Sequence, residues 1–218
     1  MKDYKYIFFD LDGTLTDPGL GITNSVAYSL EKYGISVDDR SELYKFIGPP
    51  LIDSYMDFYN FSKEKAVQAV EVYREYYAVK GIFENYVYDG IPGLLKLLQA
   101  DGKKIILATS KPEEYAKIIL EHFDLAKYFF YIAGSNMDES RSKKSEVISY
   151  ALQKCQIKDK SQVVMIGDRE HDIIGAKEIG LDSIGVLYGY GDYKELECAG
   201  ADQIVENVNG LRDILCKK

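Results

Sequence analysis

Two carboxylates two positions apart give this sequence its clearest chemical signal. Asp10 and Asp12 lie in the run DLDGTLT at positions 10–16, directly after the apolar segment IFF. If IFF is a strand of an open parallel sheet, the run begins at the strand's carboxyl end, where such sheets bind ligands. The two acids repel each other unless a cation balances them, and they suit one nucleophile and one general acid or base beside a metal ion. The alternative is a polar exit from the strand, because Asp and Gly commonly form turns.

A second apolar run, VVMIG at positions 163–167, also ends in an acid. Asp168 follows it directly and Asp172 lies four residues further on. We expect Asp168 to leave its strand at the same sheet edge as Asp10, and converging carboxylate oxygens suit Mg²⁺. Alone, the two acids would be a helix cap and a first-turn acid. Beside Asp10 and Asp12 they favour a metal site, with Asp172 as either a direct ligand or a support.

Hydroxyl and basic groups occur where a phosphate ligand would need them. Thr109 and Ser110 follow the apolar run IILA and precede a predicted helix, whose N-terminal N–H groups can bind phosphate. Thr and Ser are also common helix caps. The basic run RSKKS at positions 141–145 precedes another predicted helix. In isolation it would be a solvated loop, but one of its lysines is expected to neutralise the phosphate and Asp10.

Short apolar runs alternate with helical patterns along most of the chain, which predicts an α/β domain with a largely parallel sheet. Helices are expected to start at Pro92 and at Pro112, and a third follows the apolar stripe from Val147 to Cys155. The strands are expected at 6–9, 104–109, 129–133, 163–166, 183–186 and, more weakly, 203–205.

Residues 19–87 interrupt this alternation, because they contain no convincing strand. Apolar residues recur there at helical spacing, Ser62 is placed to cap a helix, and turn-rich linkers flank the segment. We therefore expect a helical insertion at 19–87, placed after the first strand of an α/β core formed by residues 1–18 and 88–218.

Composition restricts the class of protein. The 218 residues include 27 Lys and Arg against 35 Asp and Glu, a net charge of −8, with 46% hydrophobic residues. Such a balance is ordinary for a globular protein and argues against nucleic-acid or anionic membrane partners. Three widely spaced cysteines without a CxxC pair indicate free thiols. We expect a cytoplasmic monomer or weak dimer acting on a small molecule.

These motifs together resemble a known family. Asp10-x-Asp12-Gly-Thr, Thr109, Lys144 and Gly167-Asp168-x-x-x-Asp172 are similar to the four ordered motifs of the haloacid dehalogenase superfamily of phosphatases. The resemblance spans essentially the whole chain, with the insertion in the position of that family's type 1 cap. The run MIGDREHDIIGA at 165–176 is similar to the branch that contains phosphoglycolate phosphatases and 5′-nucleotidases. Many members have Lys-Pro-x-Pro where this chain has KKSE, and the distance to the following helical stripe favours Lys144 over Lys143.

The resemblance implies a Mg²⁺-dependent phosphatase that acts on a small phosphorylated metabolite. Asp10 would form an aspartyl-phosphate, and Asp12 would protonate the leaving alcohol and then activate water. Mg²⁺ would be held by Asp10, the backbone carbonyl of Asp12, and Asp168, with Asp172 in direct or indirect support. The groups expected to hold the transferring phosphoryl are Thr109 and Lys144, joined by Ser110 and the backbone amides of Gly13 and Thr14.

Three other activities belong to proteins with such a core. A sugar-phosphate mutase would use the same residues, and product analysis separates the two reactions. A dehalogenase is disfavoured because that branch is not expected to carry the second acid, Asp12. A non-catalytic phosphate-binding module is disfavoured because all the reactive residue types are retained.

The insertion is expected to select the substrate, because the core motifs contact only the phosphate and the metal. Within the run FIGPPL at 46–51, we expect Ile47, Gly48 and Leu51 to contact the leaving group, since the prolines stiffen the run and Gly48 permits close approach. The alternative, which the sequence supports equally, is that this run is a turn between helices that does not contact the substrate. The aromatic content of the insertion favours a nucleoside 5′-monophosphate over phosphoglycolate.

Overall fold

The computed structural model describes residues 2–138 and 140–216. The chain forms two compact units, one made of residues 1–16 and 87–218 and the other of residues 17–86. The expected insertion at 19–87 differs from the second unit by two residues at its start and one at its end.

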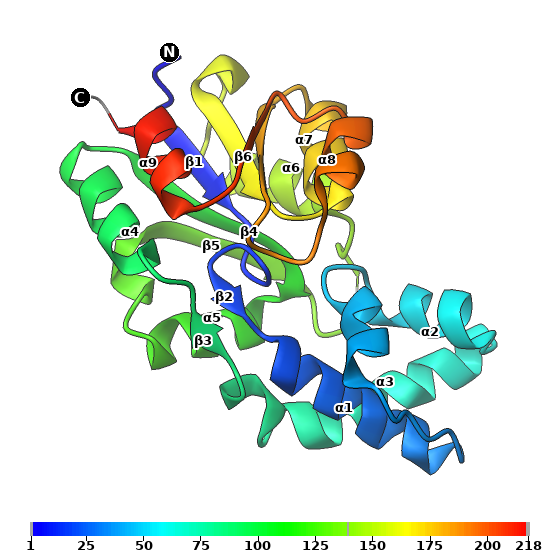
Figure 1. The fold of residues 1–218 in the computed structure, drawn as a ribbon. Coiled ribbons are helices and arrows are strands. Elements are labelled where there is room, and N and C mark those ends of the chain that lie inside the picture. Colours follow the sequence, from blue (N-terminus) through cyan, green and yellow to red (C-terminus); the bar gives the residue numbers. More distant parts are fainter. Residues whose placement is uncertain (1, 139, 217–218) are drawn as a thin grey trace. The chain divides into compact units, whose positions relative to one another are not determined.

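The larger unit contains a six-stranded parallel sheet with the strand order β5-β4-β1-β6-β7-β8 (Figure 1). In the register, Phe9 pairs with Leu107 on one side and with Ile166 on the other. β1 and β6 therefore end close together, whereas β4 continues beyond Leu107 to Pro112. The strands are β1 (Tyr6–Phe9), β4 (Lys104–Pro112), β5 (Phe129–Ser135), β6 (Val163–Gly167), β7 (Asp182–Val186) and β8 (Gln203–Val205).

Helices lie on both sides of this sheet (Figure 1). Helix α6 packs against α7, and α7 packs against α8, while α4 packs against α9. Apolar side chains of the sheet and of α6 and α7, among them Phe8, Met165 and Val147, form one buried core. The predicted α/β fold is confirmed. The helices are α4 (Ile91–Ala100), α5 (Glu113–His122), α6 (Lys144–Lys154), α7 (Glu170–Ile179), α8 (Tyr193–Ala199) and α9 (Val208–Leu215), with short turns η3 (Ala126–Tyr128) and η4 (Lys160–Gln162).

The structure corrects several predicted boundaries. Strand β4 continues to Pro112 instead of ending at Thr109, with a register shift against β5 between Ala108 and Pro112. A residue before proline favours extended backbone, which explains why the strand continues and α5 begins only at Glu113. Pro92 is the second residue of α4 and not the first. A two-stranded pairing of β2 (Thr16–Asp17) with β3 (Tyr86–Val87) was not predicted.

The smaller unit is helical apart from residues of β2 and β3. It contains α1 (Gly19–Lys32), η1 (Arg40–Phe46), α2 (Leu51–Tyr59), α3 (Lys63–Tyr77) and η2 (Gly81–Phe83), and α3 packs against both α1 and α2. Ser62 caps α3, as predicted, by accepting a hydrogen bond from Lys65 N–H. The rings of Tyr55 and Phe61 stack, and both are buried. Aromatic side chains thus form much of this unit's own core.

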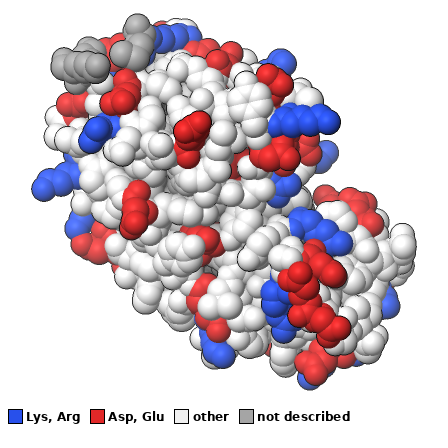
Figure 2. Space-filling model, viewed as in Figure 1, with Lys and Arg blue, Asp and Glu red and all other residues white. Residues whose placement is uncertain are grey.

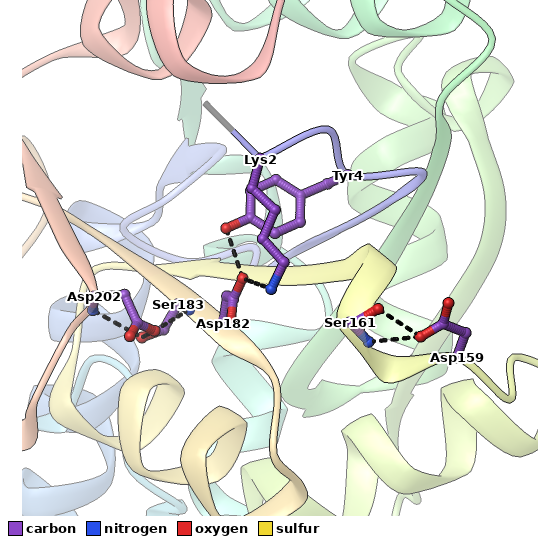
Figure 3. A network of polar contacts seen from close by, with 7 residues as sticks. All are labelled: Lys2, Tyr4, Asp159, Ser161, Asp182, Ser183 and Asp202. Carbon is purple, nitrogen blue, oxygen red and sulfur yellow. Dashed lines mark hydrogen bonds and ion pairs between the residues drawn. The ribbon is translucent and has the colours of Figure 1, made fainter.

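A network of polar contacts involves residues that precede or begin strands of the large sheet (Figure 3). The Tyr4 hydroxyl donates to Asp182 Oδ2 at 2.7 Å, and Lys2 Nζ lies 2.5 Å from the same oxygen. The Ser183 N–H donates to Asp202 at 2.8 Å. These contacts tie the segment before β1 to β7, and β7 to the segment before β8.

Charged residues of both signs are interleaved over the face seen in Figure 2. Among the helices of the described chain, none is long and apolar enough to cross a membrane.

Candidate active site

The predicted acids meet at the carboxyl ends of β1 and β6, which are neighbours in the sheet. Asp10 follows β1 and its N–H donates to Ile166 O at 2.9 Å, so the backbone of β6 fixes the start of the loop. Asp168 follows β6, and Asp172 lies in the first turn of α7. The side chains of Asp10, Asp168 and Asp172 are all buried, and one oxygen from each lies within 4.8 Å of the others.

Burial and mutual repulsion affect the protonation of this group. Burial is the main cause that raises the pKa of Asp168 well above 3.8, and the neighbouring Asp172 raises it further. The pKa of Asp172 is raised to about 6, again mainly by burial, although Lys144 lowers it in part. Three converging carboxylates favour a bound cation, and hard oxygen ligands are those that Mg²⁺ prefers.

Lys144 is the lysine that contacts the acids. Its Nζ lies 2.7 Å from Asp10 Oδ1 and 2.7 Å from Asp172 Oδ1, and it donates to Ala108 O at 3.1 Å. Burial disfavours the charged ammonium, but Asp10 and Asp172 outweigh this effect and raise the pKa of Lys144. Lys143, by contrast, is exposed at the N-cap of α6. Lys144, which the sequence favours over Lys143, is thus the one of the two that lies against the acids.

The loop after β1 closes tightly on Asp168. Gly13 has a φ of +79°, and a Cβ there would lie 2.1 Å from Asp168 Oδ2, so no larger residue fits. The Thr14 hydroxyl donates to Asp168 Oδ1 at 3.3 Å, and the Tyr190 N–H donates to Asp168 Oδ2 at 2.8 Å. These contacts orient the Asp168 carboxylate.

The predicted backbone donors to phosphate are already engaged. The Gly13 N–H donates to Thr16 O at 2.8 Å, and the Thr14 N–H donates to Leu11 O at 3.2 Å. Donation to a ligand would require these bonds to be shared or exchanged, so this role of the two amides stays a prediction. The structure instead gives Thr14 a side-chain contact to Asp168, which sequence spacing does not indicate.

Thr109 and Ser110 lie on an extended strand and not at a helix N-terminus. Thr109 is buried, and its Oγ1 accepts a hydrogen bond from Lys111 N–H at 3.3 Å. Ser110 is half-buried. Pro112 lies between both hydroxyls and α5, which begins at Glu113. The prediction that the two hydroxyls lie beside free N–H groups at a helix N-terminus is therefore wrong, because they lie near the end of β4.

Sequence reasoning missed Lys111. Its Nζ lies 2.6 Å from Asp12 Oδ2, and both side chains are largely buried. Burial raises the pKa of Asp12, and Lys111 opposes this effect. The signal was present, because Lys111 directly follows the two hydroxyl residues at the end of β4.

The three residues expected to contact the leaving group all belong to the smaller unit. Ile47 is buried, Gly48 has a φ of +107°, and Leu51 is the half-buried first residue of α2. Phe46 ends η1, so the connecting run is Ile47–Pro50, shorter than the expected 46–51. Contact of these residues with a substrate stays a prediction.

Comparison with known proteins agrees with this arrangement. A family model described as Haloacid dehalogenase-like hydrolase matches residues 7–186. The chain belongs to this family. Within it, the chain is 42% identical to a 5′-nucleotidase of Pseudomonas aeruginosa, over 97% of this chain and 96% of that protein. It is 37% identical to the Tyrosine-protein kinase PtkA of Mycobacterium tuberculosis, over 86% of this chain and 63% of that protein.

Among solved structures, a predicted phosphatase from Clostridium acetobutylicum is 52% identical, with a TM-score of 0.95 over 97% of this chain and 98% of that one. The expected resemblance to haloacid dehalogenase-like phosphatases is confirmed, and so is the expected enzyme class, a phosphoric monoester hydrolase.

Proposed function

We propose that this haloacid dehalogenase-like hydrolase cleaves a small phosphate monoester through an aspartyl-phosphate on Asp10. The observation that carries the proposal is the buried Asp10 carboxylate, held by Lys144 at 2.7 Å beside two further acids. A charged carboxylate fixed against a protonated lysine is positioned for attack on phosphorus. Lys144 also supplies positive charge where the phosphoryl oxygens gather.

The reaction has two displacement steps. An oxygen of Asp10 attacks phosphorus, the bond to the leaving oxygen breaks with its electron pair, and that oxygen takes a proton from Asp12. Water then attacks phosphorus, gives a proton to the Asp12 carboxylate, and releases Asp10 and phosphate. Asp12 thus returns to its protonated form, and the sum is ester plus water giving alcohol plus phosphate.

The buried acids fit Mg²⁺. Asp10, Asp168 and the backbone carbonyl of Asp12 are the proposed ligands, with Asp172 close enough to bind or to support them. Bound Mg²⁺ supplies positive charge that offsets the repulsion between a carboxylate nucleophile and the phosphoryl group. Burial is the main cause of the raised pKa values of Asp168 and Asp172, and repulsion between carboxylates adds to it. A bound cation would offset both effects, which supports this assignment.

We propose a nucleoside 5′-monophosphate as the substrate class, ahead of phosphoglycolate. The similarity to the Pseudomonas aeruginosa protein named 5′-nucleotidase supports this order. The aromatic content of the insertion supports it less than expected, because rings such as Tyr55 and Phe61 are buried in its own core. Residues 19–87 are proposed to act as the cap that selects the leaving group.

A panel of phosphate esters, assayed with Mg²⁺ and with a chelator, tests the proposal. It should contain nucleoside 5′-monophosphates, phosphoglycolate and sugar phosphates. We expect inorganic phosphate as the product, fastest release from the nucleotides, and loss of activity with chelator. Transfer of the phosphoryl group between positions of a sugar would instead favour a mutase, and absence of turnover on every ester would favour a binding module.

A further inference from the structure

Lys111 and Asp12 form a buried ion pair whose lysine the mechanism above does not use. Lys111 Nζ lies 2.6 Å from Asp12 Oδ2, with 6% and 11% of the two side chains exposed. A lysine shielded from water to this degree is costly unless it is paired. Phosphoryl contact is already assigned to Lys144, so the second lysine calls for a separate explanation.

The backbone of Lys111 is fixed from three directions. Its N–H donates to Thr109 Oγ1 at 3.3 Å, and Pro112 after it restricts its backbone to extended conformations. Gly134 of β5 passes so close that a Cβ at that position would lie 2.6 Å from Lys111 O. The lysine side chain therefore starts from a fixed point, and its ammonium group is held at the other end by Asp12.

The two oxygens of Asp12 have different surroundings. Lys111 contacts Oδ2, whereas Oδ1 is buried and has no hydrogen-bond partner among residues 2–138 and 140–216. A buried oxygen without a partner is uncommon and calls for an explanation. With Oδ2 held, rotation of the carboxylate is restricted and Oδ1 stays available to a second group.

We propose that Lys111 is a positioning residue that holds Asp12 Oδ2, so that Asp12 Oδ1 faces the leaving oxygen. The inference rests on the proposed function, in which Asp12 is the proton donor. As the bond from phosphorus to the leaving oxygen breaks, its electron pair stays on that oxygen, which takes the proton from Oδ1. Lys111 keeps its own protons throughout and acts only by orientation.

Substrates with different leaving groups can distinguish a Lys111 that orients Asp12 from a Lys111 that only contributes positive charge. An alkyl phosphate has a poor leaving group that needs a proton as the bond breaks, whereas p-nitrophenolate leaves readily without one. Loss of Asp12 orientation should therefore slow the alkyl ester selectively. A lysine that merely bound phosphoryl oxygens would contribute equally to both esters.

The test measures kcat/KM of Lys111→Met for p-nitrophenyl phosphate and for the alkyl phosphate that the wild type hydrolyses best. This ratio covers only the steps up to release of the alcohol, so later water attack does not obscure it. We expect a loss of about 10²-fold or more for the alkyl ester, in the range of general acid catalysis, and less than about threefold for the aryl ester. Lys111→Arg should restore part of the alkyl activity, and the exposed Lys96→Met should change neither ester.

Equal losses on both esters in Lys111→Met, or no loss on either, would overturn the inference. Asp12→Asn distinguishes this failure from failure of the proposed function. If Asp12→Asn loses activity mainly on the alkyl ester and Lys111→Met does not, only the proposed role of Lys111 is wrong. If Asp12→Asn itself shows no selectivity, Asp12 is not the proton donor and both fall. Since the comparison lies within one variant, a partial loss of folded enzyme lowers both rates alike and leaves their ratio intact.

Discussion

Lys144 contacts two carboxylates that would otherwise repel each other. Lys144→Met removes the cation beside Asp10 and leaves Asp172 without that partner, so kcat/KM should fall by about 10²-fold or more. Lys143→Met is the matched control, because Lys143 is adjacent but exposed, and we expect it to retain most activity. Steady-state kinetics of both variants on one substrate checks this. Equal losses, or a larger loss in Lys143→Met, would contradict the assignment.

Asp172 gives the proposed Mg²⁺ site an expected dependence on pH. Its pKa is raised from 3.8 to about 6, so the metal-free folded protein keeps a proton that the unfolded chain releases at lower pH. The contribution of this carboxyl to the free energy of unfolding therefore falls as the pH rises from the pKa of the unfolded chain, 3.8, to that of the folded protein, about 6. Mg²⁺ requires the deprotonated form.

Mg²⁺ should consequently raise Tm little at about pH 5 and more at about pH 7. Thermal unfolding with and without Mg²⁺ at both pH values measures this, with Asp172→Asn as the variant expected to flatten the difference. An equal rise in Tm at both pH values would be inconsistent with proton release from this site on metal binding.

At the scale of residues, the acids were predictable because each follows an apolar run that ends at the same sheet edge. Asp10 and Asp168 needed only the rule that parallel strands share their carboxyl ends. The pairing of Lys111 with Asp12, and of the Thr14 hydroxyl with Asp168, depends on the path of two loops. Periodicity and spacing contain no information on such a path, so these contacts required coordinates.

The loop after β7, like the loop after β1, contacts Asp168 from outside its own strand. Gly189 lies so close that a Cβ there would be 2.3 Å from Gly13 O and 2.4 Å from Asp168 Cβ. Gly189→Ala should displace the loop and weaken the Tyr190 N–H contact to Asp168. Loss of such a supporting contact typically lowers metal affinity by about 10- to 100-fold.

Titration of activity against Mg²⁺ measures that effect for Gly189→Ala. Gly93→Ala is the matched control, because a Cβ at Gly93 meets nothing within 4 Å and the residue lies in α4. We expect the control to keep its Mg²⁺ requirement and to be slightly more stable, since Ala favours helix. An unchanged Mg²⁺ requirement in Gly189→Ala would show that the loop does not support the metal site.

The connection between η1 and α2 is the proposed specificity element. Substituting Ile47 and Leu51 by Ala should change the relative kcat/KM among nucleoside monophosphates and phosphoglycolate, while a small generic ester is less affected. The reason is that only the leaving group differs among these substrates. A panel of esters checks the pattern, and a uniform reduction on every ester would indicate that both residues serve folding alone.

Most elements that contain an apolar run were predicted closely, and those without one were not. β1 matches its expected range because the apolar run IFF defines it, and β8 matches the weaker prediction at 203–205. β2 and β3 have two residues each, too few for any periodicity, and they pair although they lie far apart in the sequence. Helix α2 was not predicted, because the two prolines directly before it indicated a loop and drew attention away from the helix that follows.

Across the whole molecule, the acids and lysines of the candidate site all belong to the unit that contains the sheet. Their relative positions are therefore set by one core, in which β1 is paired to β4 and β6 on either side. The helical unit interrupts the chain just after the loop that carries Asp10 and Asp12. Under the proposed function, the phosphoryl chemistry takes place in the sheet unit and the insertion selects the substrate.

The proposed reaction depends on nucleophilic attack by Asp10, and detection of a phosphoryl group on this residue tests it. Wild-type protein and Asp10→Asn are mixed with the best substrate of the panel and Mg²⁺, quenched in acid within the first turnover, and analysed by mass spectrometry of the peptide that contains position 10. We expect a phosphoryl group on Asp10 in the wild type. In Asp10→Asn we expect no such adduct and a fall in turnover of several orders of magnitude, because the amide keeps the size but not the attacking charge. A folded Asp10→Asn protein that retains full turnover would contradict the account.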